Sequence, residues 1–135
     1  MAKILIVDDE ANIRINLEAI LRDQGHSVES VDSGEKALMI MRRVTPEILL
    51  TDVRMEGMSG IDLLGKTREY FPSVTVLLMT AYASVDTAVN VMRMGAHDYI
   101  VKPFTPDQIS HAIQRLEELR RLREEALSGD WRGCC

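Results

Sequence analysis

The sequence predicts an α/β fold in which helices cover both faces of a parallel β-sheet. Two observations lead to this prediction. Short, almost purely apolar runs recur along the chain, as is typical of strands buried on both faces of a parallel sheet. Each run precedes a longer segment in which apolar residues recur at the spacing of a helix. This alternation favours parallel strands joined by crossover helices.

The first half of the chain carries two strand–helix pairs. The apolar run within residues 3–7 predicts a buried strand, and residues 11–24 carry apolar side chains at helical spacing. Gly25 follows as a helix C-cap. Residues 27–31 predict a second strand. Ser33 is suited to cap a second helix, which stops before the next proline.

The third and fourth pairs follow in the middle of the chain. Residues 47–52 predict a strand that is apolar in its centre and ends on Asp52. A polar, glycine-containing loop leads to a helix expected over residues 61–70. Residues 74–80 predict the fourth strand, and residues 84–94 the fourth helix.

The fifth pair contains the clearest local signal of the chain. Residues 98–101 predict a short strand. Thr105 is then suited to cap a helix, with Pro106 at its first position and Gln108 completing a capping box. Five strands and five helices without an internal repeat predict a flavodoxin-like doubly wound sheet, with the strand order 2-1-3-4-5.

Length and composition limit the class of protein. The 135 residues, 46% hydrophobic and 27% charged, suffice for one domain with a buried core. No apolar stretch approaches the ~20 residues that span a bilayer, and nothing resembles a signal peptide. The net charge of −5 argues against direct nucleic-acid contact. Cys134 and Cys135 are adjacent, so they cannot form a disulfide that cross-links distant parts of a core. We therefore expect a cytoplasmic protein without a membrane partner.

Polar and charged residues stand at the ends of four expected strands. Asp8 and Asp9 follow the first strand, Asp52 ends the third, Thr80 ends the fourth and Lys102 follows the fifth. Because parallel strands leave a sheet at the same edge, these residues are expected to meet there. Crowded carboxylates repel one another, and a cation that prefers oxygen ligands, such as Mg²⁺, relieves this repulsion.

These residue types suit phosphoryl chemistry. A lysine ammonium and a threonine hydroxyl can bind phosphoryl oxygens, and a carboxylate can accept a phosphoryl group as an aspartyl phosphate. The residues therefore indicate Mg²⁺-dependent phosphoryl transfer onto an aspartate. Taken singly, each has a plainer interpretation, because an acid after a strand commonly caps a helix and a threonine or lysine there is often a solvated turn residue. Because all of these residues are expected at one edge of the sheet, the phosphoryl-transfer site is favoured over the separate plainer interpretations.

Five separated motifs make the sequence resemble a response-regulator receiver domain of two-component signalling. They are Val7-Asp8-Asp9-Glu10, Thr51-Asp52-Val53-Arg54-Met55, Met58-Ser59-Gly60, Thr80-Ala81, and Tyr99 with Lys102-Pro103-Phe104. The resemblance covers about residues 3–119. It implies that a sensor histidine kinase transfers a phosphoryl group to Asp52. It also implies Mg²⁺ held by Asp9, Asp52 and the backbone carbonyl of Arg54, with Asp8 acting through a water.

The same resemblance assigns residues to the phosphoryl group itself. Lys102 and Thr80 would bind its oxygens, and the small Ala81 would leave room beside it. A cis peptide bond between Lys102 and Pro103 is implied, and a bond to proline tolerates that geometry.

The resemblance also implies a switch. On activation Thr80 would swing toward the phosphoryl group, and Tyr99 would move inward behind it. Arg54 and Tyr82 lie two residues beyond Asp52 and Thr80, where their side chains would cover the site. From the pattern alone, Tyr99 is equally well interpreted as a half-buried core aromatic.

Glu56 departs from the pattern, because many members of the family have proline there. We expect it to loosen the loop and to add negative charge near the metal. The Asp52-to-Met55 motif and the long final helix most resemble receivers of sigma-54-dependent transcriptional activators of the nitrogen-regulatory type. This implies that a surface made by the fourth helix, fifth strand and last helix controls an output, namely transcription.

The last helix continues beyond the usual length of a receiver. We assign residues 1–120 to the receiver, and residues 121–135 to a helix extension and a tail leading toward an output domain. Leu116, Leu119 and Ala126 fit a heptad stripe that Arg123 interrupts. A homodimer through this helix or through the switch surface, and a solvated helix end, both remain open. Whether residues 128–135 are a linker or a foreign tail is also open.

Other functions remain as alternatives. The domain could be a stand-alone receiver or phosphorelay module. An aspartate-nucleophile phosphohydrolase would need Asp-x-Asp after the first strand, where this chain has Asp8-Asp9-Glu10. A flavin or nucleotide carrier would need a Ser/Thr/Gly-rich loop there, and acids would repel its phosphate. We expect a switch rather than an enzyme, limited to taking and slowly losing phosphate.

Overall fold

Five strands and five helices alternate along residues 2–81 and 85–127, the part of the chain that the computed structural model describes. The strands are β1 Lys3–Val7, β2 Ser27–Val31, β3 Ile48–Asp52, β4 Thr75–Thr80 and β5 Asp98–Val101. The helices are α1 Ala11–Asp23, α2 Gly34–Arg43, α3 Gly60–Tyr70, α4 Val85–Arg93 and α5 Pro106–Leu127.

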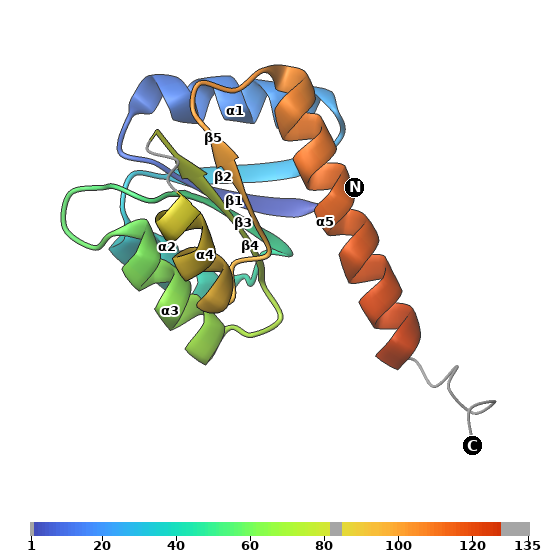
Figure 1. Ribbon diagram of the computed structural model, residues 1–135. Helices are drawn as coiled ribbons and strands as arrows, with labels where there is room; N and C mark the ends of the chain where they lie inside the picture. The colour runs from blue at the N-terminus through green and yellow to red at the C-terminus, as the bar shows by residue number, and fades with distance from the viewer. Residues whose placement is uncertain (1, 82–84, 128–135) are drawn as a thin grey trace.

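All strands are parallel and take the order β2-β1-β3-β4-β5, which confirms the predicted fold class (Figure 1). The helices α1 and α5 cover one face of the sheet, whereas α2, α3 and α4 cover the other (Figure 1). The strands β1, β3 and β4 lie in the interior of the sheet, so β3 has a hydrogen-bonded neighbour on each side.

The predicted strands agree with the structure to within one residue at each end. β4 begins at Thr75 rather than Val74, because the Val74 N–H donates to the carbonyl of Phe71 and closes a turn (3.0 Å). The expected first residue of the fourth helix, Ser84, lies outside the described residues. That helix is followed by Gly95 at a φ of 105°, a left-handed conformation that glycine adopts readily.

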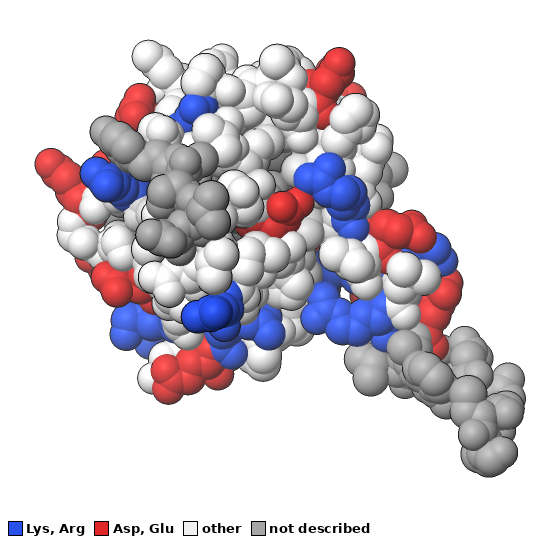
Figure 2. All heavy atoms as spheres, in the orientation of Figure 1, with Lys and Arg blue, Asp and Glu red and all other residues white. Residues whose placement is uncertain are grey.

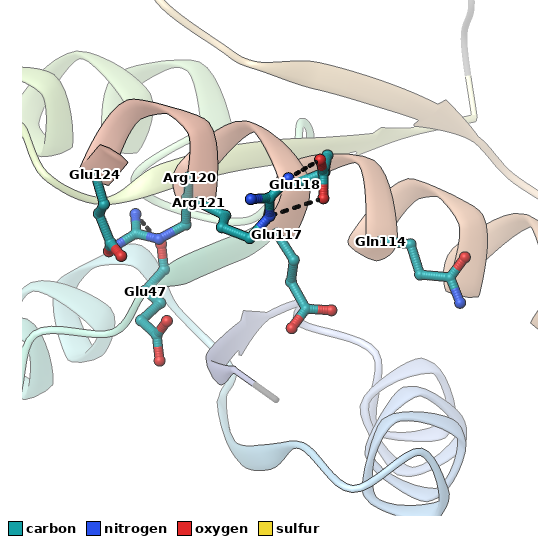
Figure 3. A pocket seen from close by; sticks show the side chains of 7 residues that line it. All are labelled: Glu47, Gln114, Glu117, Glu118, Arg120, Arg121 and Glu124. Atoms are coloured by element: carbon teal, nitrogen blue, oxygen red, sulfur yellow. Dashed lines mark hydrogen bonds and ion pairs between the residues drawn. The ribbon is translucent and has the colours of Figure 1, made fainter. Parts of the chain in front are cut away.

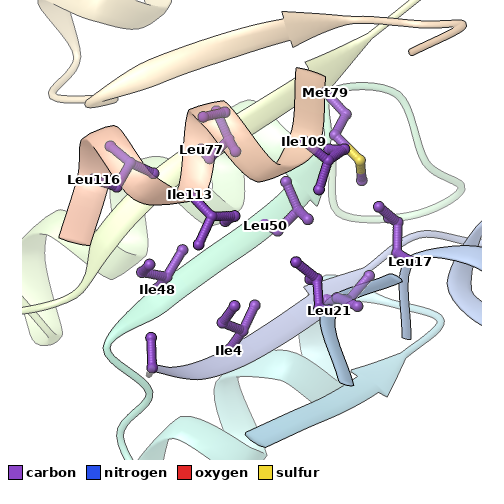
Figure 4. Close-up of a cluster of buried hydrophobic side chains, with 13 residues drawn as sticks. Ile4, Leu17, Leu21, Ile48, Leu50, Leu77, Met79, Ile109, Ile113 and Leu116 are labelled. Atoms are coloured by element: carbon purple, nitrogen blue, oxygen red, sulfur yellow. The ribbon is translucent and has the colours of Figure 1, made fainter. Parts of the chain in front are cut away.

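The sheet is buried on both faces because side chains alternate along each strand. On β1, Ile4 and Ile6 join the cluster under α1 and α5, whereas Leu5 and Val7 join the cluster under α2, α3 and α4. Figure 4 shows the first cluster, in which Ile113 of α5 lies over the central strands. Substantial apolar surface is thus removed from water on each side, and the central strands become a rigid support for the residues at their ends.

The helix α5 is the longest helix, with 22 residues, or about 33 Å at 1.5 Å per residue. It starts with the predicted capping box. The Gln108 N–H donates to Thr105 Oγ1 (3.2 Å), and the Thr105 N–H donates to Gln108 Oε1 (2.8 Å). Its distal part runs past the sheet (Figure 1). No helix in the described part of the chain combines the length and apolar character needed to cross a membrane.

His97 is a partly buried titratable group that the sequence did not single out. It lies between α4 and β5. Its ring Nδ1 accepts a hydrogen bond from the Val76 N–H (3.1 Å), and its backbone N–H donates to the Val76 carbonyl (2.9 Å). Burial, followed by the charges of Arg68, Arg123 and Arg120, lowers the pKa of His97 to about 4. The imidazole is therefore neutral at pH 7 and joins the start of β5 to β4.

Acid is expected to destabilise the protein through His97. Its folded pKa lies below the unfolded value of about 6.5, so its contribution is complete above that pH and is lost as the pH falls toward 4. We expect a loss on the order of 1–2 kcal/mol, less than the full pKa difference implies, because the ring is partly exposed. Urea unfolding across this range should show a shallower acid dependence in His97→Gln, whereas His111→Gln, at an exposed position of α5, should behave like the original chain. Equal acid dependence in all three proteins would contradict this assignment.

Candidate functional site

The carboxyl ends of four neighbouring strands bring the predicted residues together. Asp8 follows β1, Asp52 and Thr80 are the last residues of β3 and β4, and Lys102 follows β5. Because β1, β3, β4 and β5 are consecutive in the sheet, their ends form one row. Asp8 is fully buried, and Asp52 and Thr80 are only 7% and 5% exposed. Two carboxylates are thus withdrawn from water at a single edge.

Lys102 binds both of these carboxylates. Its Nζ lies 2.9 Å from Asp8 Oδ2 and 3.1 Å from Asp52 Oδ2. The peptide bond between Lys102 and Pro103 is cis, the geometry that the resemblance implied. The ammonium therefore occupies the place between the strand ends at which a phosphoryl group on Asp52 would need a positive charge.

The electrostatics of this pair are dominated by burial. Burial raises the pKa of Asp52, and this effect outweighs the opposing charge and hydrogen bond of Lys102. For Lys102, burial acts to lower the pKa, but the hydrogen bond and charge of Asp8 and the charge of Asp52 outweigh it, so the pKa is raised. Lys102 is therefore held as a cation, and the ionised carboxylate of Asp52 is poorly solvated.

The loop between β1 and α1 gathers three acids that can offer oxygens to a cation. One carboxylate oxygen from each of Asp8, Asp9 and Glu10 lies within 4.8 Å of the others. The Asp8 side chain is fixed by the Glu10 N–H (2.9 Å), and the Asp8 carbonyl accepts a hydrogen bond from Arg14 Nη1 (2.7 Å). This all-oxygen set fits a hard cation such as Mg²⁺. Glu10 was not among the predicted ligands, although it is part of the quoted motif, and Asp52 lies outside this group.

The loop between β3 and α3 contacts this acidic group through Glu56. Its side chain is exposed, but its backbone N–H donates to Asp9 Oδ2 (3.4 Å). A proline at this position has no N–H and could not make the contact. The sequence led us to expect a looser loop at Glu56, and it gave no sign of this additional hydrogen bond.

Gly60 lies directly against the backbone of Asp52. Its N–H donates to the Val53 carbonyl (2.9 Å), which fixes the start of α3 to the exit of β3. A Cβ added to Gly60 would lie 1.9 Å from the Asp52 carbonyl oxygen and 2.9 Å from the Val53 Cα. Only glycine permits this approach, so Gly60 helps to set the position of Asp52.

The remaining predicted residues lie around this edge with different exposure. Arg54 and Ala81 are exposed, and Tyr82 lies outside the described residues. Tyr99 pairs with Leu78 in the parallel register, which places it on the α4 side of β5, and its side chain is 36% exposed. The structure therefore brings together Asp8, Asp52 and Lys102, while Tyr99 stands apart from their hydrogen bonds.

Comparisons with known proteins match the chain to a family profile and to longer regulators. The sequence profile of the response regulator receiver domain matches residues 4–114. The regulatory protein AtoC of Escherichia coli is 39% identical over 96% of this chain and 29% of its own length. The DNA-binding transcriptional regulator NtrC of Klebsiella pneumoniae is 36% identical over 91% of this chain and 27% of its own length. This chain therefore spans less than a third of these relatives.

A solved structure has the same fold. The response regulator receiver domain protein of Clostridium thermocellum superposes with a TM-score of 0.84 at 31% identity, covering 90% of this chain and 98% of that chain. Similarity to NtrC confirms the expected likeness to regulators of the nitrogen-regulatory type.

Proposed function

Since this chain belongs to the response regulator receiver family, we propose that Asp52 accepts a phosphoryl group from a sensor histidine kinase. Receivers of this family are signalling switches rather than enzymes in the usual sense. The observation that carries the proposal is the buried Asp52 carboxylate at the end of β3, with Lys102 Nζ 3.1 Å from its Oδ2. A nucleophile and a cation for phosphoryl oxygens are thus adjacent.

In the proposed phosphoryl transfer, the protein positions the reacting groups and supplies charge to stabilise them. A carboxylate oxygen of Asp52 attacks phosphorus, the phosphorus–nitrogen bond of the donor phosphohistidine breaks, and the leaving imidazole nitrogen takes up a proton from water. The raised pKa of Asp52 reflects poor solvation of its carboxylate, which favours attack. Lys102 then neutralises charge on the phosphoryl oxygens, and Thr80 donates its hydroxyl to them. Slow hydrolysis would return Asp52 to its initial state.

Receivers of this family bind Mg²⁺ at an acidic pocket, and the residues of this chain fit such an ion. We assign Asp9, Asp52 and the Arg54 carbonyl to the ion and Asp8 to a water between them; the grouping of Glu10 with Asp8 and Asp9 adds a further candidate. When bound, Mg²⁺ supplies positive charge for the phosphoryl oxygens. Lys102 Nζ contacts Asp8 and Asp52, and the Glu56 N–H contacts Asp9, so these carboxylates are held close to one another.

We assign the response to phosphate to the surface formed by α4, β5 and α5. Thr80 would move toward the phosphoryl group, and Tyr99 would turn inward from its exposed position on β5. Exposed apolar side chains of this surface and of distal α5 are Val89, Met92, Tyr99, Val101, Leu119 and Leu122. Such a surface suits a second copy of this chain, and the extended α5 offers a second route to a homodimer.

The output is proposed to be transcription. The relatives named as transcriptional regulators are more than three times as long as the stretch they share with this chain, so those proteins have room for a separate output domain. A stand-alone receiver or phosphorelay module is the alternative. We place the domain in the cytoplasm, and its net charge of −5 argues against direct contact with nucleic acid.

Phosphorylation of Asp52 is tested by intact mass. With Mg²⁺ and a small-molecule phosphodonor, the chain should gain the mass of one phosphoryl group. Asp52→Asn should gain none, whereas Asp62→Asn, at an exposed acid of α3, should gain it as the original chain does. No adduct, or an adduct that survives in Asp52→Asn, would refute the assignment. Sedimentation of the same samples reports whether the adduct changes the oligomeric state.

A further inference from the structure

The distal half of α5 is fastened to the edge of the sheet opposite Asp52. This edge is formed by the residues just before β3 and by the first residues of β4. In Figure 1 the distal part of α5 runs past the sheet on the side where the strands begin. The last described residues of α5 therefore lie at the edge of the domain remote from the proposed phosphorylation site.

Arg120 makes the fastening. Its Nη1 donates to the carbonyls of Glu47 (2.9 Å) and Ser73 (2.6 Å) and to Thr75 Oγ1 (2.9 Å). Figure 3 shows the Arg120 side chain directed from α5 toward Glu47. Arg123, one turn further along, donates from Nη2 to the same Thr75 oxygen (3.3 Å). We call Arg120, Arg123 and Thr75 the α5 clamp.

The α5 clamp lies at the starts of the two strands whose other ends carry the proposed switch residues. Glu47 immediately precedes β3, which ends on Asp52, and Thr75 begins β4, which ends on Thr80. Thr75 and Thr80 are separated by five residue steps, or about 17 Å along an extended strand. Both strands are buried throughout. A shift of either strand at one end must therefore move the side chains packed around it.

The α5 clamp includes features that oppose folding stability. Arg120 Nε is buried and has no hydrogen-bond partner among the described residues. The charges of Arg68, Arg120 and Arg123 all act on His97, so three guanidinium groups gather near the start of β5. In Figure 2 basic side chains collect where distal α5 passes the body of the domain. Like charges brought together repel one another, and their desolvation costs free energy, so the α5 clamp is better explained by a role in positioning α5 than by stability alone.

We propose that Arg120 and Arg123 are positioning residues that fix the direction of distal α5 and couple it to β4. A change at Thr80 then reaches residues 120–127 along β4 and through Thr75, in addition to any path over the exposed α4, β5 and α5 surface. This inference rests on the proposed phosphorylation of Asp52. It also places the boundary of the rigid domain beyond residue 120, because Arg123 belongs to the α5 clamp.

The chain offers matched variants for a test. Thr75→Val removes the shared oxygen while keeping a β-branched side chain in the strand, and Arg120→Gln removes the three hydrogen bonds from α5. Arg121→Gln is the control, since Arg121 is exposed and pairs with Glu118 and Glu125 of its own helix. Amide hydrogen exchange of residues 121–127 is measured in the full chain, with and without Mg²⁺ and a small-molecule phosphodonor.

Without the phosphodonor, protection of residues 121–127 should fall about tenfold in Thr75→Val and Arg120→Gln, as the loss of a charge-assisted hydrogen bond predicts, and should not change in Arg121→Gln. With the phosphodonor, the change in exchange seen at these residues in the original chain should persist in Arg121→Gln and disappear in the two clamp variants, although the adduct forms equally in all. Because Thr75→Val tests the same contact from the strand, the result does not depend on the folding of Arg120→Gln.

Two outcomes would overturn the inference. One is unchanged protection in Thr75→Val. The other is a phosphorylation-dependent change that is as large in the clamp variants as in the original chain. If intact mass shows no adduct on the original chain, the proposed function fails instead, and the comparison without phosphodonor still decides whether the clamp positions α5.

Discussion

Lys102→Met is expected to destabilise the protein by about 3 kcal/mol at neutral pH, because it leaves two buried carboxylates without their cation. Lys102 Nζ is bonded to Asp8 and Asp52, and its side chain is only 13% exposed. The same change should nearly abolish phosphorylation, since no other described ammonium contacts Asp52 Oδ2. Lys66→Met, at an exposed position of α3, should alter neither property.

The pH dependence of this effect follows from the raised pKa of Asp52. A carboxyl group whose folded pKa is raised stabilises the fold below its unfolded pKa, and this contribution is lost as the pH rises through the folded pKa. Without Lys102 the pKa of Asp52 should rise further, so the variant should recover stability relative to the original chain as the pH falls. Urea unfolding at several pH values measures this. A loss of stability that is equal at neutral and acid pH would contradict the role of Lys102 as the neutralising charge.

Gly60→Ala is expected to cost at least about 3 kcal/mol of folding stability, because its new methyl group would overlap backbone rather than a movable side chain. The Cβ would lie 1.9 Å from the Asp52 carbonyl oxygen, so either β3 or α3 must shift. Any shift displaces Asp52 from Lys102, and the initial rate of phosphorylation should fall with stability. Thermal and urea unfolding, together with the intact-mass assay, measure both effects.

Gly65 supplies the control within the same helix. Apart from its chain neighbours and the backbone of its own helix, no described atom lies within 4 Å of a Cβ added there. Gly65→Ala should therefore stabilise α3 by about 0.5–1 kcal/mol through its better helix propensity. Phosphorylation should be unchanged. If Gly60→Ala proved as stable and as active as Gly65→Ala, the close approach of α3 to Asp52 would not position the nucleophile.

The elements and the row of strand-end residues could be predicted from the sequence because they depend on local rules. Apolar runs of strand length, helical periodicity and the Thr105 capping box each act over a few residues. Once strands and helices alternate, the parallel direction puts Asp52, Thr80 and Lys102 at a common edge. The family motifs named the residue expected to take the phosphoryl group.

The contacts that hold the candidate site could not be predicted in this way. The bonds from Lys102 to Asp8 and Asp52 span 94 and 50 residues of sequence. The contact to Asp9 uses the backbone N–H of Glu56, and a backbone group leaves no mark on residue type. Sequence pattern also treated Gly60 as one member of a turn, whereas its lack of a side chain is what allows α3 to reach Asp52.

The sequence by itself therefore determined the fold class and the strand ends, because hydrophobic period and strand direction depend on neighbouring residues. The family motifs added Asp52 as the residue proposed to accept the phosphoryl group. Only the tertiary structure decided how the carboxylates are held, why His97 stays neutral and where α5 is fastened. Those features depend on distances between segments remote in the chain, and such distances are set by the register of the sheet and the packing of helices upon it.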